Sequence, residues 1–284
     1  MTEPGSATFV PSAARVAVFD NDGTLWCERP TYPQALFVME RVRSQAALDP
    51  DLASLPVVRA LLAGDLRAAL ADGLEPLAEV ILRAHAGLTP AEYASEVSGW
   101  FARAVHPTRG VAFGRLVYQP MLELIDLLRE AAFRVFIVTG GGVEFVRAVS
   151  ADLYGIPPDD VVGSSVELAV ERREGRLELV RRPAFRGPPN EGEPKPLNIQ
   201  AHIGVRPILA AGNSAGDREM LEYASTGPGA TLAIVLDHDY AEREDAYGGA
   251  SFTDPGAEPI LATAGRLGWT VVSMRRDWSA VFGD

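Results

Sequence analysis

The sequence predicts an α/β fold in which a Rossmann-like parallel sheet is covered by helices on both faces and carries an inserted helical cap and a small β-hairpin. Short apolar runs of strand length alternate with longer stretches of helical periodicity. The stretch between the first two runs is far too long for an ordinary crossover. Later in the chain, a charged Glu-Gly turn separates two further strand-like runs, which indicates the hairpin.

Five apolar runs have the length and composition expected of core strands. They are Val16–Phe19, Val135–Val138, Pro207–Ala211, Thr231–Val235 and Thr270–Val272. Because helical segments separate them, we expect these strands to pair in parallel within one sheet.

The long stretch between the first two strands has few strand signals and reads as helical. It contains a good helix start, in which Thr89 caps a Pro at the first helical position and Glu92 closes a capping box. We therefore expect a Rossmann-like core over residues 1–26 and 113–284, with a helical cap over residues 27–112 inserted between the first and second strands.

The hairpin is expected from two strands, Val161–Val170 and Leu177–Val180, joined by a turn at Glu174-Gly175. The following segment, Arg182–Pro196, holds five prolines and is predicted to be a loop.

The bulk composition narrows the class of protein. The chain has 284 residues, is 47% hydrophobic and carries a formal net charge of -12. Nucleic acid is excluded as a partner because a phosphate backbone requires a basic face. One cysteine, Cys27, allows no internal disulfide, and no apolar run is long enough to span a membrane. We expect a soluble cytoplasmic protein with no membrane partner, and the oligomeric state stays open.

Polar side chains follow three of the predicted strands where each strand ends. Asp20 and Asp22 follow the first, Thr139 follows the second, and Asn213 and Asp217 follow the third. The carboxyl ends of parallel strands meet at one edge of a sheet, which is where open sheets bind ligands. Carboxylate and amide oxygens suit Mg²⁺, and the glycines after Thr139, from Gly140 on, open a helix whose backbone N–H groups favour an anion. The sequence therefore predicts a site for phosphoryl chemistry.

Lys195 is the only lysine in the chain, because the other 25 basic residues are arginines. Three carboxylates and a phosphate dianion would leave an excess of negative charge even after Mg²⁺ binds. A compact ammonium group fits a crowded site better than the planar fork of arginine. Lys195 is thus a candidate to neutralise this site, although a lone lysine on a surface loop is the alternative.

Taken in order, these segments resemble the four motifs of the haloacid dehalogenase superfamily, in particular its phosphoserine-phosphatase-like branch. Asp20–Thr24 resembles the first motif, DxDGT, Thr139 the second and Lys195 the third. Gly212–Asp217, followed by Arg218–Leu221, resembles the fourth motif, GDxxxDxxML. The insert falls where this family places a helical C1-type cap.

The resemblance implies a magnesium-dependent phosphatase acting on a small phosphorylated metabolite. Asp20 would attack phosphorus and form an aspartyl-phosphate, and Asp22 would protonate the leaving oxygen and later activate water. Thr139, Gly140 and Lys195 would hold the phosphoryl oxygens. Mg²⁺ would be bound by Asp20, the main-chain carbonyl of Asp22, and the fourth-motif residues Asn213 and Asp217.

Two positions make the resemblance incomplete. Asn213 stands where the family usually has Asp, so an amide oxygen can still bind Mg²⁺ but a negative charge is lost. Glu28 lies near the position of a substrate-contacting acid in the related phosphoserine phosphatases, although the spacing differs.

Alternative functions remain. Gly212–Gly216 also fits G-x-S-x-G, the nucleophile elbow of serine hydrolases, with Ser214 as nucleophile. Only His238 follows it, with Asp237 directly before, and adjacent residues cannot easily act as base and orienting acid. A catalytically inactive phosphate-binding module is a third class, and a dehalogenase is disfavoured because a halide leaving group needs no general acid at Asp22.

Overall fold

The computed structural model describes residues 1–69, 71, 74–251, 254 and 256–283. Its main sheet consists of β1 (Val16–Phe19), β2 (Arg134–Gly142), β3 (Val161–Ser164), β6 (Leu209–Gly212), β7 (Leu232–Asp239), β8 (Ala246–Tyr247) and β9 (Thr270–Ser273). The strands lie in the order β3-β2-β1-β6-β7-β8, and β9 also pairs with β7. All pairs in this sheet are parallel except β7 with β8, so the predicted parallel α/β sheet is confirmed.

The central strand β1 shows that both faces of the sheet are covered. All four of its residues are fully buried, and alternate side chains point to opposite faces. Val16 and Val18 pack in one apolar cluster, whereas Ala17 and Phe19 pack in another. The first face is covered by α10 (Pro194–His202), α11 (Arg218–Ser225) and α12 (Ile260–Leu267). The second is covered by α7 (Gln119–Glu130), α8 (Val143–Arg147), α9 (Ser150–Tyr154) and α13 (Met274–Asp277).

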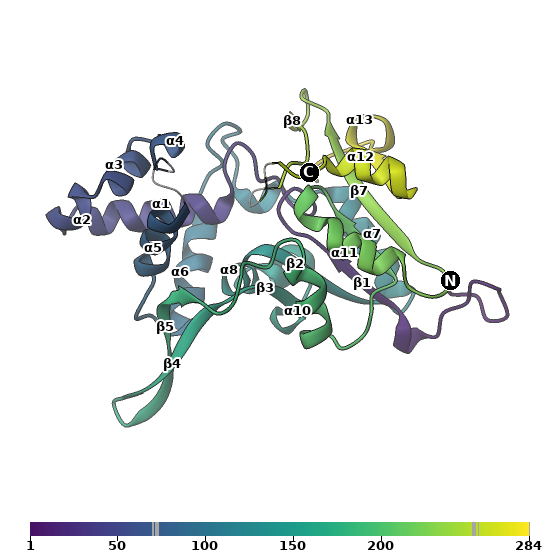
Figure 1. Cartoon of the computed structure of the whole chain (residues 1–284), viewed down its shortest axis with the longest axis horizontal. Helices are drawn as coiled ribbons and strands as arrows, with labels where there is room; N and C mark the ends of the chain where they lie inside the picture. Colours follow the sequence, from purple (N-terminus) through teal and green to yellow (C-terminus); the bar gives the residue numbers. More distant parts are fainter. Residues whose placement is uncertain (70, 72–73, 252–253, 255, 284) are drawn as a thin grey trace.

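The first and longer part of the segment between β1 and β2 is helical and projects from one end of the sheet (Figure 1). The projecting helices are α1 (Pro33–Ala46), α2 (Pro50–Ser54), α3 (Pro56–Leu62), α4 (Leu66–Ala69), α5 (Leu74–Ala84) and α6 (Pro90–Arg103), whereas α7, which follows them, packs on the sheet. The capping box of Thr89 and Glu92 is present at the start of α6. Phe37 of α1 packs on Phe145 of α8, with ring centroids 5.5 Å apart, so the insert shares apolar contacts with the sheet-covering helices. The division at residues 27 and 112, and the role of the insert as a cap, stay predictions.

The predicted hairpin strand Val161–Val170 is divided in the structure, and this corrects the prediction. β3 pairs in parallel with β2 in the main sheet, whereas β4 (Val166–Arg173) pairs antiparallel with β5 (Arg176–Phe185). The sequence shows one continuous apolar run here, which does not reveal where the chain leaves the main sheet. The hairpin lies beside the insert, because Arg181 exchanges backbone hydrogen bonds with Gly87 and Leu88.

The structure also corrects the predicted loop and the predicted helix start. β5 extends to Phe185 and α10 begins at Pro194, so only the middle of Arg182–Pro196 is irregular. Lys195 consequently lies in the first turn of a helix. The glycines after Thr139 continue β2 through Gly142 with an irregular register, and the short α8 begins at Val143.

Candidate active site

Asp20 and Lys195 form a buried ion pair that joins the ends of three strands. Lys195 is 1% exposed, and its Nζ donates to Asp20 Oδ1 at 2.7 Å, Asp217 Oδ1 at 2.6 Å and the Val138 carbonyl at 2.9 Å. These contacts use all three ammonium protons. Burial alone would lower the pKa of Lys195, but the two carboxylates outweigh it and raise the pKa above its usual range. Burial and the nearby Asp217 raise the pKa of Asp20 well above its usual value, although Lys195 opposes this shift.

Asp217 is turned inward, toward Lys195 and its own loop. Its Oδ1 accepts from Lys195, while Oδ2 accepts from the backbone N–H groups of Asn213 and Ser214, both at 3.0 Å. Its side chain is 1% exposed. This geometry favours a role in positioning Lys195 and the loop after β6, and the predicted metal ligation by Asp217 stays a prediction that these hydrogen bonds do not favour.

Ser214 acts as a helix cap in the structure. Its hydroxyl donates to Asp217 Oδ2 at 3.3 Å and accepts from the Gly216 N–H at 3.2 Å. Both ring nitrogens of His238 are engaged elsewhere, Nδ1 with Glu244 Oε2 at 3.1 Å and Nε2 with the Gly23 carbonyl at 2.8 Å. A Ser-His pair of the kind that a serine hydrolase requires is therefore not formed among these described residues.

Asp22 is held beside the end of β2 by a tryptophan. The Trp26 Nε1–H donates to Asp22 Oδ1 at 2.7 Å. A Cβ atom placed on Gly141 would lie 3.6 Å from Asp22 Oδ2 and 3.3 Å from Thr139 Oγ1, so these groups surround the same space. Burial raises the pKa of Asp22 to about 6, despite the opposing hydrogen bond from Trp26. A carboxyl group with this pKa can hold a proton for transfer near neutral pH.

Thr139 and Gly140 lie in the irregular end of β2, next to Asp22. Thr139 is fully buried, and its Oγ1 accepts from the Gly141 N–H at 2.9 Å. The Gly140 carbonyl accepts from Ser164 Oγ at 2.7 Å, which fixes this segment against β3. From the insert, Gln34 Oε1 accepts from the Gly142 N–H at 2.8 Å. The structure thus brings the second motif, the first motif and a residue of the insert to one place.

Glu28 is buried beside the first and fourth motifs. It is 2% exposed, and its Oε2 has no hydrogen-bond partner among the described residues. A Cβ atom placed on Gly23 would lie 3.0 Å from Glu28 Oε2 and 2.1 Å from Asn213 Nδ2, so both side chains face the same side of this glycine. Burial raises the pKa of Glu28 to about 7, although His238 opposes the shift.

The donor set suits a hard divalent cation. Asp20, the Asp22 backbone and the Asn213 amide offer oxygen ligands at one edge of the sheet, which is the ligand type that Mg²⁺ prefers. The orphaned oxygen of Glu28 adds a buried negative charge that a cation would offset. The residues present therefore fit Mg²⁺.

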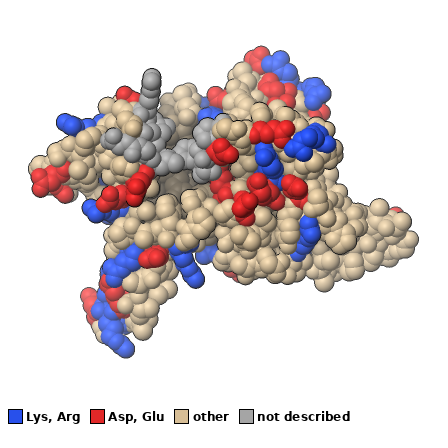
Figure 2. All heavy atoms as spheres, viewed as in Figure 1, with Lys and Arg blue, Asp and Glu red and all other residues tan. Residues whose placement is uncertain are grey.

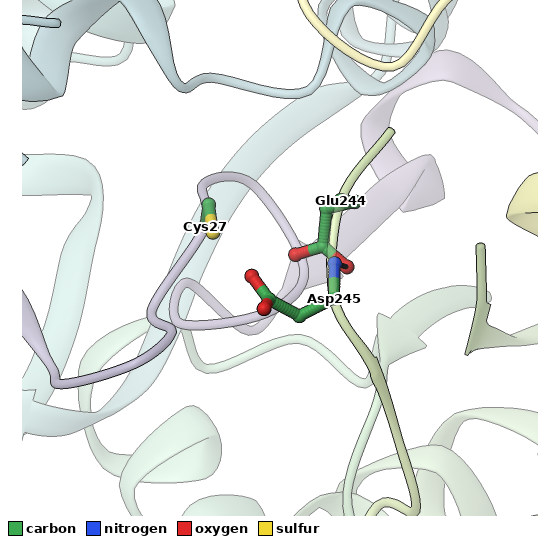
Figure 3. A group of neighbouring side chains, drawn as sticks. All are labelled: Cys27, Glu244 and Asp245. Atoms are coloured by element: carbon green, nitrogen blue, oxygen red, sulfur yellow. Dashed lines mark hydrogen bonds between the residues drawn. The ribbon is translucent and has the colours of Figure 1, made fainter. Parts of the chain in front are cut away.

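A second group of possible metal ligands lies nearby, formed by Cys27, Glu244 and Asp245, whose ligand atoms are within 4.8 Å of one another (Figure 3). The oxygens of Glu244 already accept from Tyr118 at 2.8 Å, His238 at 3.1 Å and the Asp245 N–H at 2.7 Å. Burial raises the pKa of the Cys27 thiol far above its usual value, which disfavours the thiolate that a metal would need. We therefore interpret this group as part of the hydrogen-bonded core and not as a metal site.

The charged side chains on the surface are consistent with the formal net charge of -12. Figure 2 shows Asp and Glu side chains grouped near the middle of one face, with Lys and Arg scattered among them and toward its edges. None of the described helices combines the length and apolar character needed to cross a membrane.

Sequence reasoning missed two residues that shape this site, His238 and Gln34. His238 was interpreted as ordinary, but it contacts the backbone of the first motif and pairs with Glu244. Its position near the end of β7 was an available signal, because that is where site residues gather in such sheets. Gln34 had no signal in the sequence, because its contact with β2 depends on how the insert folds back.

The structure shows an α/β sheet with a buried Asp-Lys-Asp cluster at the carboxyl ends of its strands. The chain belongs to the haloacid dehalogenase-like hydrolase family, which matches residues 17–222. A comparison with curated proteins finds no match.

Solved structures show similarity of fold. A functionally unknown protein from Anaerococcus prevotii DSM 20548 has a TM-score of 0.57 and 16% identity, covering 93% of this chain and 86% of that one. A protein of unknown function from Bordetella pertussis Tohama I has a TM-score of 0.54 and 18% identity, covering 91% of this chain and 97% of that one. The similarity extends over nearly the whole chain, insert included.

Proposed function

We propose that the protein is a magnesium-dependent phosphatase that hydrolyses a small phosphomonoester through an aspartyl-phosphate on Asp20. The observation that carries the proposal is the buried cluster of Asp20, Lys195 and Asp217, with the protonatable Asp22 two residues beyond the nucleophile. Membership of a hydrolase family supports it.

In the first half of the reaction, an Asp20 carboxylate oxygen forms a bond to phosphorus while the bond to the ester oxygen breaks. Lys195 engages Oδ1 of Asp20 and thereby orients the carboxylate, which leaves Oδ2 for attack. Asp22 delivers its proton to the departing alcohol, so that no free alkoxide forms. Hydrogen bonding by Trp26 fixes one oxygen of Asp22 and aims the other toward the space beside Gly141.

In the second half, Asp22, now ionised, takes a proton from water, and the water oxygen attacks phosphorus. Asp20 leaves as a carboxylate and inorganic phosphate is released, so both aspartates return to their starting states. Thr139 and the Gly140 segment hold the phosphoryl oxygens, and Lys195 offsets part of their charge.

Asp20, the Asp22 carbonyl and Asn213 would hold Mg²⁺. When bound, the ion would neutralise charge on the phosphate and orient it. We assign Asp217 to positioning Lys195, because its oxygens are already engaged with Lys195 and with the loop amides.

The first test compares two nucleophile variants on p-nitrophenyl phosphate and a panel of phosphomonoesters with Mg²⁺. Asp20→Asn should lose roughly 10⁴-fold or more in kcat, because an amide cannot form the acyl phosphate. Ser214→Ala should retain most activity, and chelation should abolish turnover until Mg²⁺ is restored. The opposite pattern on an added carboxylic-ester panel, with Ser214→Ala inactive and Asp20→Asn active, would favour the serine hydrolase.

A further inference from the structure

We propose that Glu28 supplies the magnesium site with the carboxylate charge that Asn213 does not provide. The inference rests on the proposed magnesium-dependent function and assigns a further residue to the same site. Asn213 is a neutral amide in a loop whose counterpart in the motif carries a carboxylate, so the cation would otherwise meet one negative charge fewer.

Glu28 lies on the side of the site where that charge is missing. A Cβ atom at Gly23 would collide with Asn213 Nδ2 and lie 3.0 Å from Glu28 Oε2, so both side chains lie against this glycine. The other amide atom of Asn213, Oδ1, accepts from Thr24 Oγ1 at 3.3 Å. Gly23 directly follows Asp22, and the main-chain carbonyl of Asp22 is a proposed ligand of Mg²⁺. A carboxylate here can contact the cation, or a water bound to it, from the Asn213 side.

The hydrogen-bonding state of Glu28 indicates that a partner is missing. His238 and Tyr247 offset part of the cost of burying Glu28, and the half-exposed Arg29 places its Nε 3.6 Å from Oε1. Even so, Oε2 has no partner with good hydrogen-bond geometry among the described residues. A buried carboxylate oxygen without a partner is costly, and native proteins rarely keep one without a reason. A cation seated between Asp20, the Asp22 carbonyl and Asn213 would provide that partner.

Other charged groups near Glu28 do not fulfil this role. His238 donates to the Gly23 carbonyl and pairs with Glu244, so both of its nitrogens are in use. Lys195 is saturated by Asp20, Asp217 and the Val138 carbonyl. The charge of His238 offsets part of the negative charge around Gly23, and a bound cation would offset more of it.

The test is a double-mutant cycle on Mg²⁺ binding, measured by calorimetric titration of the full chain without substrate. Glu28→Gln should weaken Mg²⁺ binding by roughly 10–100-fold, the range typical of residues that support a metal site. Asn213→Asp should restore most of the affinity when it is added to Glu28→Gln, because it returns the missing carboxylate. Asp245→Asn is the matched control, since it removes one negative charge nearby without facing Asn213, and its affinity should equal that of the parent.

Three outcomes distinguish a failure of the Glu28 assignment from a failure of the proposed phosphatase function. If the parent binds Mg²⁺ and Glu28→Gln binds it equally well, or if Asn213→Asp does not rescue Glu28→Gln, the assignment of Glu28 is wrong and the phosphatase proposal stands. If the parent binds no Mg²⁺, the proposed function itself fails. Should Glu28→Gln not fold, as judged by thermal melting, Glu28→Asp keeps the charge but withdraws it by one methylene. That variant should also bind more weakly than the parent, and equal binding would overturn the inference.

Discussion

At the scale of single residues, Lys195 connects the parts of the site. Its ammonium group is surrounded by three oxygens at 2.6–2.9 Å, two from carboxylates that approach from different strands and one from a backbone carbonyl. A buried charge of this kind is stable only when its partners are fixed, and removing it leaves two buried carboxylates facing each other. Lys195 therefore stabilises the arrangement that positions Asp20.

We predict that Lys195→Ala loses roughly 10²–10³-fold or more in kcat, the range for deleting a preorganised electrostatic contact. Lys195→Arg should fail nearly as badly, because the longer planar fork cannot place one nitrogen within reach of all three oxygens. Arg172→Ala, on the exposed hairpin, removes the same charge and should be as active as the parent. Steady-state kinetics on one phosphomonoester measure all three, and a fully active Lys195→Arg would show that only long-range charge matters.

How much of the site the sequence could predict depends on whether a residue lies in a local motif. Asp20 and Asp22 belong to a local motif, and Lys195 is the only lysine in the chain. In the structure Asp20 and Lys195 form an ion pair, and Asp22 lies near them at the end of β2. The inward orientation of Asp217 could not be predicted, because its partners lie in its own loop and in α10. Gln34 makes a contact that depends on the tertiary fold and has no signal in the sequence, whereas His238 lies near the end of β7, a position that could have marked it.

At the scale of secondary-structure elements, the insert contains a histidine that is buried in its neutral form. His85, at the end of the α5 segment, stacks on Phe37 of α1 with ring centroids 4.7 Å apart, and its side chain is 3% exposed. Burial, together with Arg41 and Arg181, lowers the pKa of His85 to about 3. The folded state therefore disfavours protonation of His85, whereas the unfolded chain protonates it freely.

This difference predicts a pH dependence of stability with a definite sign. The folded pKa lies below the ordinary value of 6.5, so the stabilisation is present above about pH 6.5 and is lost as the pH falls. Between pH 7 and pH 5 the parent should lose about 2 kcal/mol from this group. His85→Phe keeps an aromatic ring against Phe37 but cannot be protonated, so its free energy of unfolding should fall less over the same pH range. Urea unfolding at both pH values measures the difference, and equal losses in the two proteins would contradict the prediction.

The elements themselves were predictable to different degrees. The core strands have apolar runs bounded by turn residues, and each of the five lies in the main sheet. The sequence predicted one strand over Val161–Val170, whereas the structure has two, β3 and β4. The boundary was not predictable because apolar, β-branched residues suit the main sheet and the hairpin equally well. The end of β5 at Phe185 was missed because prolines indicate a loop, although an edge strand tolerates them.

At the scale of the whole molecule, the insert and the hairpin form one continuous structure beside the site. Arg181 of β5 exchanges backbone hydrogen bonds with the insert, and its guanidinium lies over Tyr93 of α6, 3.9 Å from the ring centroid. The same side chain forms an ion pair with Glu144 of α8. Gln34 of α1 reaches the end of β2. We therefore expect the insert to close over the bound phosphate and exclude water.

Hydrogen exchange with beryllofluoride and Mg²⁺, which mimic the phosphorylated aspartate, tests this closure. Backbone amides in residues 28–36 of the insert and 176–185 of the hairpin should exchange more slowly in the complex than in the free protein. Asp20→Asn provides the control, because it should not form the complex. Protection confined to β1 and the loops of the core, with the insert unchanged, would show that the insert does not act as a cap.

The most direct test of the central claim is to trap the covalent intermediate. Borohydride reduces an aspartyl-phosphate to homoserine, so protein quenched during turnover of p-nitrophenyl phosphate with Mg²⁺, then reduced and digested, can be read by mass spectrometry. The account predicts homoserine at position 20 in the parent and no trapped product in Asp20→Asn. An active enzyme that shows an unmodified Asp20 together with a phosphoryl group on Ser214 would contradict it.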